Sequence, residues 1–422
     1  MNSISTLPFT INGKTYKPAA KPIVVICMDG SADEYLDAAM ARNRMPNLKK
    51  MVMQGYKGMV RGALPSFTNV NNTSIVTGLS PAGHGICGNY FFDAALQQEV
   101  MMNAASYLKT ETILAASAVA GRKAAVVTAK EKLRDILSHQ LKGIAFSAEK
   151  AAEARLKTHS IEEVEQLVGQ PSPPIYSAEA SLFVLRAGVA LLARGMADFL
   201  YLSLTDYMQH TYAPDTEQSL AFYEAQDIEL GKMLDLGAIV AATADHGMNA
   251  KVKADGSPNI VFIETLLTER FGAGFRVICP ITDPYVKHHG ALGSYAVVYV
   301  NDNTRIDEVK NWLSLQDGIT EVYDKAMGCR LLEQPTDRSG DLFILSARDV
   351  VLGKTAADHD LSALDGTLRS HGGRYEEMVP MLISHPLNTA YKMKAQGDPR
   401  NFDIFDFAIN GTVKDQSRKQ KD

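Results

Sequence analysis

The 422-residue chain is 46% hydrophobic and 22% charged, which is typical of a soluble globular protein and excludes a disordered or collagen-like chain. Its length allows two or three modules, although one large doubly wound sheet can occupy roughly 200 residues by itself. The formal net charge of −5 gives no reason to expect a nucleic acid or an anionic membrane as partner, so any anion site must be local.

The cysteines and the N-terminus bear on the cellular compartment. Cys27, Cys87, Cys279 and Cys329 stand far apart and form no CxxC pair, which argues against a thiolate zinc site and a disulfide framework. The N-terminal stretch MNSISTLPFTINGKTYKP lacks the basic and apolar regions of a signal peptide, and no stretch approaches the roughly 18 apolar residues of a membrane span. We therefore expect a cytoplasmic protein with reduced thiols and no membrane or nucleic-acid partner. A homodimer is possible.

Continuous apolar, β-branched runs recur along the chain and are typical of buried parallel strands. They occupy residues 23–28, 123–128, 198–204 and 237–242, and helical segments at 33–54, 179–194 and 215–235 lie between them. This alternation predicts an α/β fold in which a mostly parallel sheet is covered by helices on both faces. In such sheets the ligand site lies beyond the carboxyl ends of the strands.

A second, smaller module is expected within residues 255–340. Strands and helices alternate there in short elements, at 295–300, 304–315, 319–323 and 323–332. We interpret this module as a small α+β cap domain inserted into the sheet domain.

The boundaries of the cap follow from turn-forming stretches. Residues 255–258 (DGSP) and 335–340 (PTDRSG) carry the proline and glycine of hinges, and the apolar run 342–346 (LFILS) is expected to return the chain to the core. Residues 1–254 and 341–422 then form the α/β core that holds the metal site discussed next.

Acids and histidines follow three of the predicted strands and recur near the C-terminus, as Asp29, Asp206, His210, Asp245, His246 and His371. Each signal alone is weak, because a lone Asp-Gly is commonly a turn and a lone Asp-x-x-x-His is commonly a solvated helix face. Together they belong at one sheet edge, where neighbouring buried carboxylates are costly unless a cation neutralises them. Mixed carboxylate and imidazole ligands suit zinc, or manganese or iron at similar geometry. The pattern therefore predicts a metal site.

A nucleophile is expected where a loop turns into the helical stretch 70–76. Thr68 stands at this turn, and a threonine there is often only a helix N-cap. A helix N-terminus also attracts anions, and a metal beside the hydroxyl would activate it at neutral pH. Ser66, Thr73 and Ser74 are competitors that the residue pattern does not separate from Thr68.

Four ordered motifs, PSFTNVNNTSIVTGLSPAGHGICGN, DYMQH, TADHG and SHGG, resemble the alkaline phosphatase superfamily in its nucleotide pyrophosphatase/phosphodiesterase branch. The resemblance spans most of residues 22–250 and 340–390. It implies an alkaline-phosphatase-like sheet and two divalent metal ions, zinc in preference to Mn²⁺ or Fe²⁺. It further implies one metal held by Asp206, His210 and His371, and a second held by Asp29, Asp245 and His246.

The same resemblance implies the catalytic groups. Thr68 would bridge the metals as the nucleophile, and Asn89 would donate to a phosphoryl oxygen, although an asparagine after glycine is also ordinary turn chemistry. No arginine stands directly beside the nucleophile, so selectivity must come from elsewhere in the pocket. Lys130 and Lys132 follow the second strand and would hold a substrate carboxylate, unless they only begin a solvated helix.

Three cap residues, Lys287, His288 and His289, are further substrate-binding candidates, although a cap loop needs polar residues in any case. The stretches ICMDGS, TAKEKLR, DYMQHTYAP and HHGALGS resemble the members of the branch that cleave a carbon–phosphorus bond. The resemblance implies hydrolysis of phosphonoacetate to acetate and phosphate through a phosphothreonine intermediate.

Three alternatives remain open at this point. A phosphodiesterase or nucleotide pyrophosphatase would use the same two-metal core, with an aromatic slot for a base in place of a carboxylate clamp. A non-catalytic metal- or anion-binding protein could keep the fold, but it would not need Thr68. A phosphomutase would differ in its product and not in its metals.

Overall fold

The computed structural model describes residues 7–413 except 286, 288 and 365. Its largest sheet has seven strands in the order β4-β19-β10-β3-β9-β7-β8. The strand β19 runs antiparallel to both β10 and β4, while β10, β3, β9, β7 and β8 run parallel to one another. The bounds are β3 Ile23–Cys27, β4 Tyr56–Arg61, β7 Ala124–Thr128, β8 Ile144–Ser147, β9 Phe199–Ser203, β10 Ile239–Thr243 and β19 Met378–Ile383.

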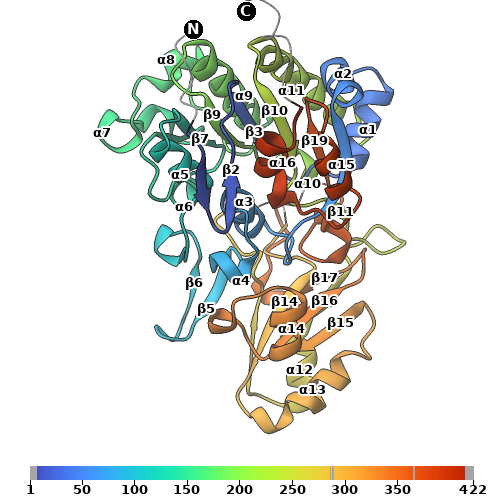
Figure 1. Ribbon diagram of the computed structural model, residues 1–422. Helices are drawn as coiled ribbons and strands as arrows, with labels where there is room; N and C mark the ends of the chain where they lie inside the picture. The colour runs from blue at the N-terminus through green and yellow to red at the C-terminus, as the bar shows by residue number, and fades with distance from the viewer. Residues whose placement is uncertain (1–6, 286, 288, 365, 414–422) are drawn as a thin grey trace, which may run out of the picture.

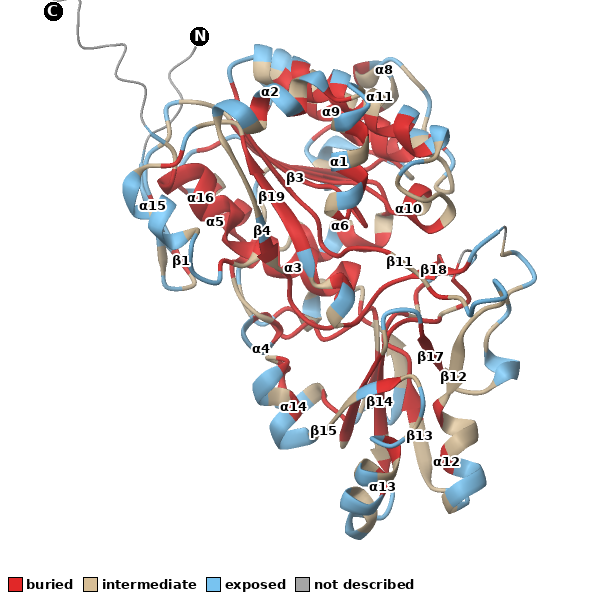
Figure 2. Cartoon of the chain, turned by 90° about the vertical axis from the view of Figure 1, so that its right-hand side faces the viewer, coloured by how far each residue is buried: buried red, intermediate tan, exposed pale blue. Residues whose placement is uncertain are grey.

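Helices cover both faces of this sheet, as predicted (Figures 1 and 2). Alternate side chains of β3 enter two separate cores, with Val24 and Ile26 on one face and Ile23 and Val25 on the other. Burial on both faces explains why the strands are continuous apolar runs. The first face packs against α1 Asp33–Ala41, α2 Pro46–Gln54, α9 Ala178–Ala193 and α11 Glu217–Asp235; the second packs against α3 Thr68–Thr77, α5 Ile113–Val119, α6 Glu131–Leu137 and α16 Ile404–Asn410.

The single helix expected over 33–54 is two helices, α1 and α2. Between them Asn43 has a φ of 55°, in the left-handed region, and Pro46 occupies the first turn of α2. An asparagine tolerates that conformation and a proline favours the start of a helix, so the two residues end one helix and begin the next.

A smaller antiparallel sheet has the strand order β13-β14-β16-β15 and lies below the large sheet in Figure 1. The apolar run 342–346 forms β16 at the interior of this sheet, so the expectation that it returns the chain to the core sheet is wrong. The division into core and cap at 255–340 itself stays a prediction. The elements are α12 Ile263–Phe271, β13 Phe275–Ile278, β14 Tyr295–Val300, α13 Ile306–Leu313, β15 Ile319–Asp324, α14 Lys325–Leu331 and β16 Leu342–Ser346.

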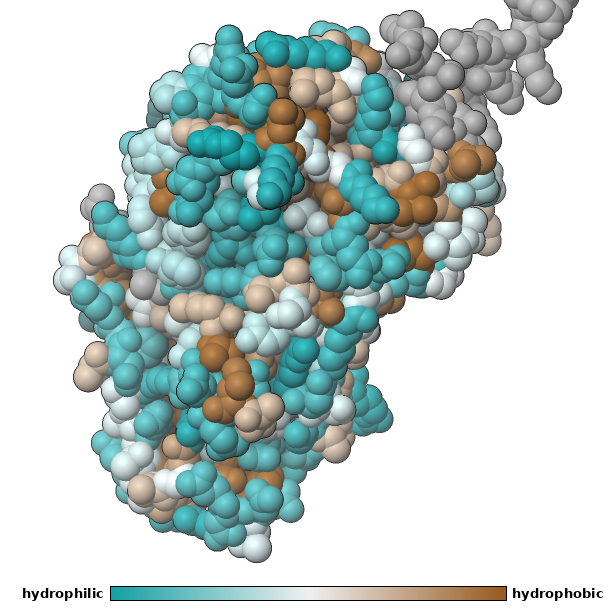
Figure 3. Space-filling view, turned by 90° about the vertical axis from the view of Figure 1, so that its left-hand side faces the viewer, coloured by the Kyte–Doolittle hydropathy of each residue, from teal (hydrophilic) through white to brown (hydrophobic). Residues whose placement is uncertain are grey.

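Four two-stranded pairs and short helices complete the described chain. The pairs are β1 Phe9–Ile11 with β2 Lys14–Tyr16, β5 Tyr90–Asp93 with β6 Gln98–Met101, β11 Asn249–Ala250 with β18 Arg369–Ser370, and β12 Ile260–Phe262 with β17 Val351–Gly353. The short helices are α4 Pro81–His84, α7 Leu156–His159, α8 Val164–Val168, α10 Tyr207–Thr211 and α15 Thr389–Lys394. On the face in Figure 3, hydrophobic residues lie in small groups between hydrophilic ones. None of the described helices combines the length and apolar character needed to cross a membrane.

Candidate metal centre and active site

The predicted metal ligands gather beyond the carboxyl ends of β3, β9 and β10. Asp29 follows β3, Asp206 follows β9 and begins α10, and Asp245 and His246 follow β10. His371 comes directly after β18, which pairs with β11 next to the end of β10. Parallel strands end at one edge of a sheet, so residues far apart in sequence meet there. All of these side chains are buried.

Asp206, His210 and His371 form the first ligand cluster. The Oδ2 atom of Asp206 lies 3.0 Å from Nε2 of His210 and 3.8 Å from Nε2 of His371. The Nδ1–H of His210 donates to the carbonyl oxygen of Arg369 at 2.7 Å, and that of His371 donates to Ser66 at 2.8 Å. These bonds fix both imidazoles with Nε2 directed at the carboxylate, the arrangement typical of metal-binding histidines.

Asp29, His246 and Asp206 form a second cluster, so Asp206 belongs to both. Nε2 of His246 lies 3.2 Å from Oδ1 of Asp29 and 3.9 Å from Oδ2 of Asp206, and its Nδ1–H donates to Gly247 at 2.9 Å. The structure thus brings the two predicted ligand sets together at one place. Their roles as ligands stay predictions.

Asp245 accepts three hydrogen bonds from described residues. Its Oδ1 accepts from the backbone N–H groups of Gly30 and His246, and its Oδ2 accepts from Asn72 at 3.0 Å. Oδ2 lies 3.8 Å from Nε2 of His246. Asp245 therefore stands at the rim of the second cluster with its orientation fixed by three donors.

The environment of the Asp29 carboxylate shows whether these residues are suited to a cation. Both of its oxygens are buried and accept no hydrogen bond from the described residues, which is costly for a carboxylate. Burial, with the charges of Asp206 and Asp245, raises its pKa to about 8. A carboxylate crowded by two others, with the Lys130 ammonium group 3.8 Å away, is suited to a metal ion, which would supply further positive charge.

Thr68 is the first residue of α3, and its Oγ1 lies 3.4 Å from Nε2 of His246. The three competing hydroxyls are bound elsewhere. Ser66 donates to Gly373 and accepts from Gly372, and Thr73 donates to the carbonyl of Asn69. Ser74 shares a 2.8 Å hydrogen bond with Nε2 of His84. Geometry therefore favours Thr68 as the nucleophile, which the residue pattern alone did not.

Asn89 lies against the start of α3. Its Oδ1 accepts from the backbone N–H of Asn69 at 3.1 Å, and its Nδ2 donates to the carbonyl of Ile281 at 3.2 Å. A side-chain amide has two N–H bonds, so one remains for a phosphoryl oxygen beside Thr68. Its proposed role stays a prediction.

Lys130 and Lys132 are buried beside the metal clusters. Nζ of Lys130 donates to Oδ1 of Asp206 at 2.8 Å and lies 3.8 Å from Oδ2 of Asp29. Burial opposes its charge, but the Asp206 and Asp29 carboxylates raise the pKa of Lys130 above its ordinary value. Lys132 pairs with Asp283 at 2.5 Å, yet burial lowers its pKa. The interpretation of these residues as a solvated helix start is therefore wrong.

The three remaining substrate-binding candidates differ in position. Lys287 is exposed, with Nζ 5.6 Å from the centre of the Tyr176 ring. His289 is buried and stacks on His210 at 5.2 Å, and burial lowers its pKa to about 3. His288 lies outside the described residues. Of the two described candidates, His289 is the one that lies against a predicted metal ligand.

A family model, type I phosphodiesterase / nucleotide pyrophosphatase, matches residues 23–374. The chain belongs to this family. A phosphonoacetate hydrolase from Sinorhizobium meliloti 1021, solved with phosphonoacetate and with phosphonoformate, is 42% identical and superposes with a TM-score of 0.91. The match covers 97% of this chain and 100% of that one. The resemblance inferred from the motifs and the α/β fold class are thus confirmed.

More distant phosphodiesterases share parts of the family pattern. Murine ectonucleotide pyrophosphatase/phosphodiesterase 5 is 16% identical with a TM-score of 0.63 over 93% of this chain and 96% of that one, which shows the common fold. A Caenorhabditis elegans ectonucleotide pyrophosphatase/phosphodiesterase is 38% identical over 81 residues, 19% of this chain. That stretch spans 10% of the worm protein's length.

Asp283 and Tyr285 lie beside the two predicted substrate-binding lysines, and sequence reasoning missed them. The Tyr285 ring centre lies 5.8 Å from Nζ of Lys130 and 5.7 Å from Nζ of Lys132, and the Tyr285 hydroxyl donates to Glu149. The backbone N–H of Tyr285 donates to Asp283. A carboxylate and an aromatic ring two residues apart in a loop carry no motif, so no local signal could have identified them.

Asn72 is a second omission, and here a signal existed. Its amide donates to Asp245 and to the carbonyl of Thr68, and its Oδ1 accepts from the hydroxyls of Tyr201 and Ser203. It stands four residues after Thr68, one helical turn along, and therefore on the same face of α3.

Proposed function

We propose that the enzyme hydrolyses the carbon–phosphorus bond of phosphonoacetate to give acetate and phosphate. The observation that carries the proposal is the 42% identity, over nearly the whole of both chains, with a phosphonoacetate hydrolase solved with phosphonoacetate. The convergence of the predicted ligands, Thr68 and the two lysines at one sheet edge is what such a reaction needs.

Asp206, His210 and His371 would hold one divalent ion, and Asp29, Asp245 and His246 a second. We propose zinc, because mixed carboxylate and imidazole ligands suit it. When bound, such ions polarise phosphoryl oxygens and lower the pKa of a neighbouring hydroxyl. The chain contributes the orientation, since backbone carbonyls hold all three imidazoles through Nδ1.

Thr68 would attack phosphorus through Oγ1. Once the Thr68 hydroxyl has lost its proton to solvent, the Oγ1–P bond forms as the P–C bond breaks, which leaves a phosphothreonine and an acetate carbanion in its enolate-like form. That carbanion takes a proton from solvent to become acetate, and a water molecule then hydrolyses the phosphothreonine to phosphate. Asn89 would donate its remaining N–H to a phosphoryl oxygen at the helix N-terminus, where negative charge is favoured.

Lys130 and Lys132 would stabilise the carboxylate end of the substrate. A carbanion is a poor leaving group, so charge that develops on the departing acetate must be offset by a fixed cation. The Asp283 carboxylate already offsets much of the positive charge of Lys132. We propose that Asp283 orients the Lys132 ammonium group toward the substrate carboxylate. Asp283 also compensates the buried charge of Lys132 while no substrate is bound.

A phosphodiesterase activity is the second candidate, because the family model that matches the chain is named for it. One comparison ranks the two. The zinc-loaded protein is incubated separately with phosphonoacetate, a nucleotide diester and an aryl phosphate, and product release is followed. We expect the highest kcat/KM with phosphonoacetate. A higher kcat/KM with the nucleotide diester would contradict the proposal, and no turnover of any substrate would favour a binding protein.

A further inference from the structure

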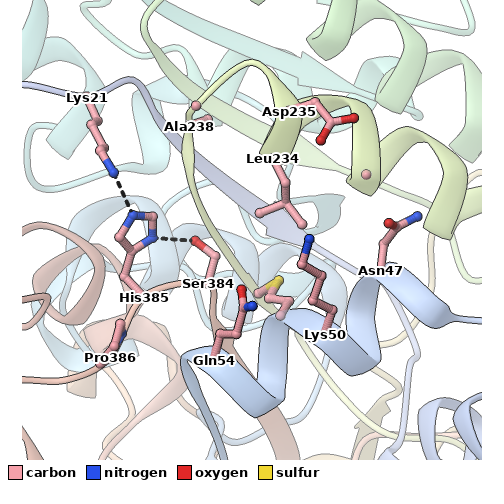
Figure 4. A pocket seen from close by; sticks show the side chains of 13 residues that line it. Lys21, Asn47, Lys50, Gln54, Leu234, Asp235, Ala238, Ser384, His385 and Pro386 are labelled. Carbon is pink, nitrogen blue, oxygen red and sulfur yellow. Dashed lines mark hydrogen bonds between the residues drawn. The ribbon is translucent and has the colours of Figure 1, made fainter.

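A pocket lies at the opposite edge of the large sheet from the metal centre. It has a volume of about 430 Å³ and is lined by the segments that enter β3 and β10, by the segment that leaves β19, and by α2 and α11 (Figure 4). The metal ligands follow the other ends of β3 and β10. Ligand pockets in proteins typically measure roughly 300–1,000 Å³, so this one has room for a small metabolite.

The polarity of one wall follows from the hydrogen bonds of His385. Nζ of Lys21 lies 2.9 Å from Nε2 of His385, and an ammonium group can only donate, so Nε2 accepts. Nδ1 then carries the proton of the neutral ring and donates to Oγ of Ser384 at 2.9 Å (Figure 4). Lys21 therefore holds His385 as a neutral donor to Ser384.

The hydroxyl of Ser384, which lines the pocket, is left as a hydrogen-bond donor. Its Oγ also accepts from the backbone N–H of Val240 at 3.0 Å, so two donors occupy its lone pairs. The described residues offer the hydroxyl hydrogen no acceptor at hydrogen-bond distance. A hydroxyl whose two lone pairs both accept hydrogen bonds can only donate a further one. An acceptor atom of a ligand would satisfy this remaining O–H group.

The opposite wall supplies a cation. Figure 4 shows the Lys50 side chain reaching from α2 toward Leu234 of α11. Lys50 forms no ion pair within the described part of the chain, and the Gln54 amide lies beside it on the same helix. Asp235 is the one carboxylate among the described lining residues, and Lys50 contributes an ammonium group from α2. The described lining thus offers the Lys50 ammonium group, the Gln54 amide and the Ser384 hydroxyl as hydrogen-bond donors.

We propose that this pocket is a second, non-catalytic anion site that takes a small phosphoryl dianion. Lys50 and Ser384 contact its oxygens from opposite walls, with Lys21 holding the imidazole behind Ser384. A dianion with several acceptor oxygens matches one free ammonium group, one obligate hydroxyl donor and one amide better than a single carboxylate does. The inference is independent of the proposed reaction, because none of these residues lies at the metal centre.

Inorganic phosphate is the probe, and the imidazole of His385 is the reporter. The full-length protein is labelled with ¹⁵N-histidine, and the His385 signals are assigned with His385→Asn. Phosphate is titrated at constant ionic strength, at a pH where it is a dianion. We expect a saturable shift of the His385 signals. Lys50→Gln should weaken the apparent affinity by roughly tenfold or more, the effect of one charged hydrogen bond.

The matched control is Lys49→Gln, which removes an exposed neighbouring lysine that does not line the pocket. Its affinity should equal that of the unmodified protein. Acetate should bind more weakly than phosphate. The proposal is overturned if phosphate does not move the His385 signals, if Lys50→Gln and Lys49→Gln respond alike, or if acetate binds as tightly as phosphate. Because no outcome depends on turnover, failure here leaves the proposed reaction untouched, and the converse also holds.

Discussion

At the scale of single residues, the hydroxyl of Thr68 is the group on which the proposed reaction depends. Thr68→Ala should keep the fold and the metal content but lower kcat by several orders of magnitude, because no covalent intermediate can form. Thr68→Ser is the matched control, since it retains a hydroxyl on α3. A kcat for Thr68→Ala within about tenfold of the parent, roughly 1.4 kcal/mol of barrier, would assign the attack to another group.

Lys132 gives a test of substrate selectivity. Lys132→Ala should lower the hydrolysis of phosphonoacetate by roughly 10- to 150-fold, the effect of one charged hydrogen bond of about 1.5–3 kcal/mol, and should affect an aryl phosphate ester much less. The variant also leaves Asp283 buried without its partner. Asp283→Asn in the same chain removes that unpaired charge. If the double variant regains phosphonoacetate turnover, Lys132 serves only to neutralise Asp283.

Lys130 should behave differently, because it pairs with a predicted metal ligand. Lys130→Ala leaves Asp206 without its 2.8 Å ammonium partner, so both substrates should be hydrolysed more slowly and the metal affinity should change. Metal content and kcat/KM for both substrates are measured together. A loss confined to phosphonoacetate, at unchanged metal affinity, would place Lys130 on the substrate carboxylate alone.

At the scale of elements, a buried ion pair ties together the loops that carry His246 and His371. Lys251 follows β11 and pairs with Glu376 at 2.8 Å, and both side chains are fully buried. Glu376 also accepts from the backbone N–H of Gly373, and its carbonyl accepts from Gly247. Lys251→Met should lower the free energy of unfolding by about 3–5 kcal/mol, because it leaves a buried carboxylate unpaired.

Chemical denaturation measures this effect, and a second variant separates its cause. Glu376→Gln combined with Lys251→Met removes both charges and should recover a large part of the lost free energy of unfolding. If the double variant is as unstable as Lys251→Met, packing and not the unpaired charge accounts for the loss.

The elements also show what the sequence could predict. The edge where Asp29, Asp206 and Asp245 meet was predictable, because each follows an apolar strand and parallel strands end together. The sheet to which residues 342–346 belong was not predictable. An apolar run indicates that a strand is buried, but it does not indicate which strands pair with it. The pairing of Lys132 with Asp283 spans 151 positions, and no local pattern encodes such a contact.

At the scale of the whole molecule, metal binding should stabilise the fold. The carboxylates and imidazoles at the site come from distant parts of the chain, so an ion that binds them binds only the folded state. Excess chelator should abolish activity and lower the thermal midpoint, and zinc should restore both. His210→Ala should lower zinc content as well as rate. Full turnover with metal shown to be absent would exclude the two-metal site.

Acid should destabilise the protein through buried neutral histidines away from the metal centre. Burial, with the nearby charge of Arg338, lowers the pKa of His84 to about 3. The unfolded chain, with a histidine pKa of about 6.5, takes up this proton first as the pH falls. The contribution of His84 is therefore complete above pH 6.5 or so and is lost toward pH 3, by up to roughly 1.4 kcal/mol per pH unit. His84→Gln should flatten the pH dependence of the free energy of unfolding by that slope. An unchanged slope would contradict the assignment.

The helix α3 has a consequence for how the molecule tolerates change. Seven of its residues are polar in TNVNNTSIVT, so its composition is that of a surface helix, yet all ten residues are buried. Five of its polar side chains form hydrogen bonds to other residues, namely those of Asn69, Asn71, Asn72, Thr73 and Ser74. Neither a hydrophobic nor a different polar residue reproduces those partners. In a library of random variants selected for growth on a phosphonate, surviving substitutions should accordingly be rarer on α3 than on the apolar strands, where one branched residue often replaces another.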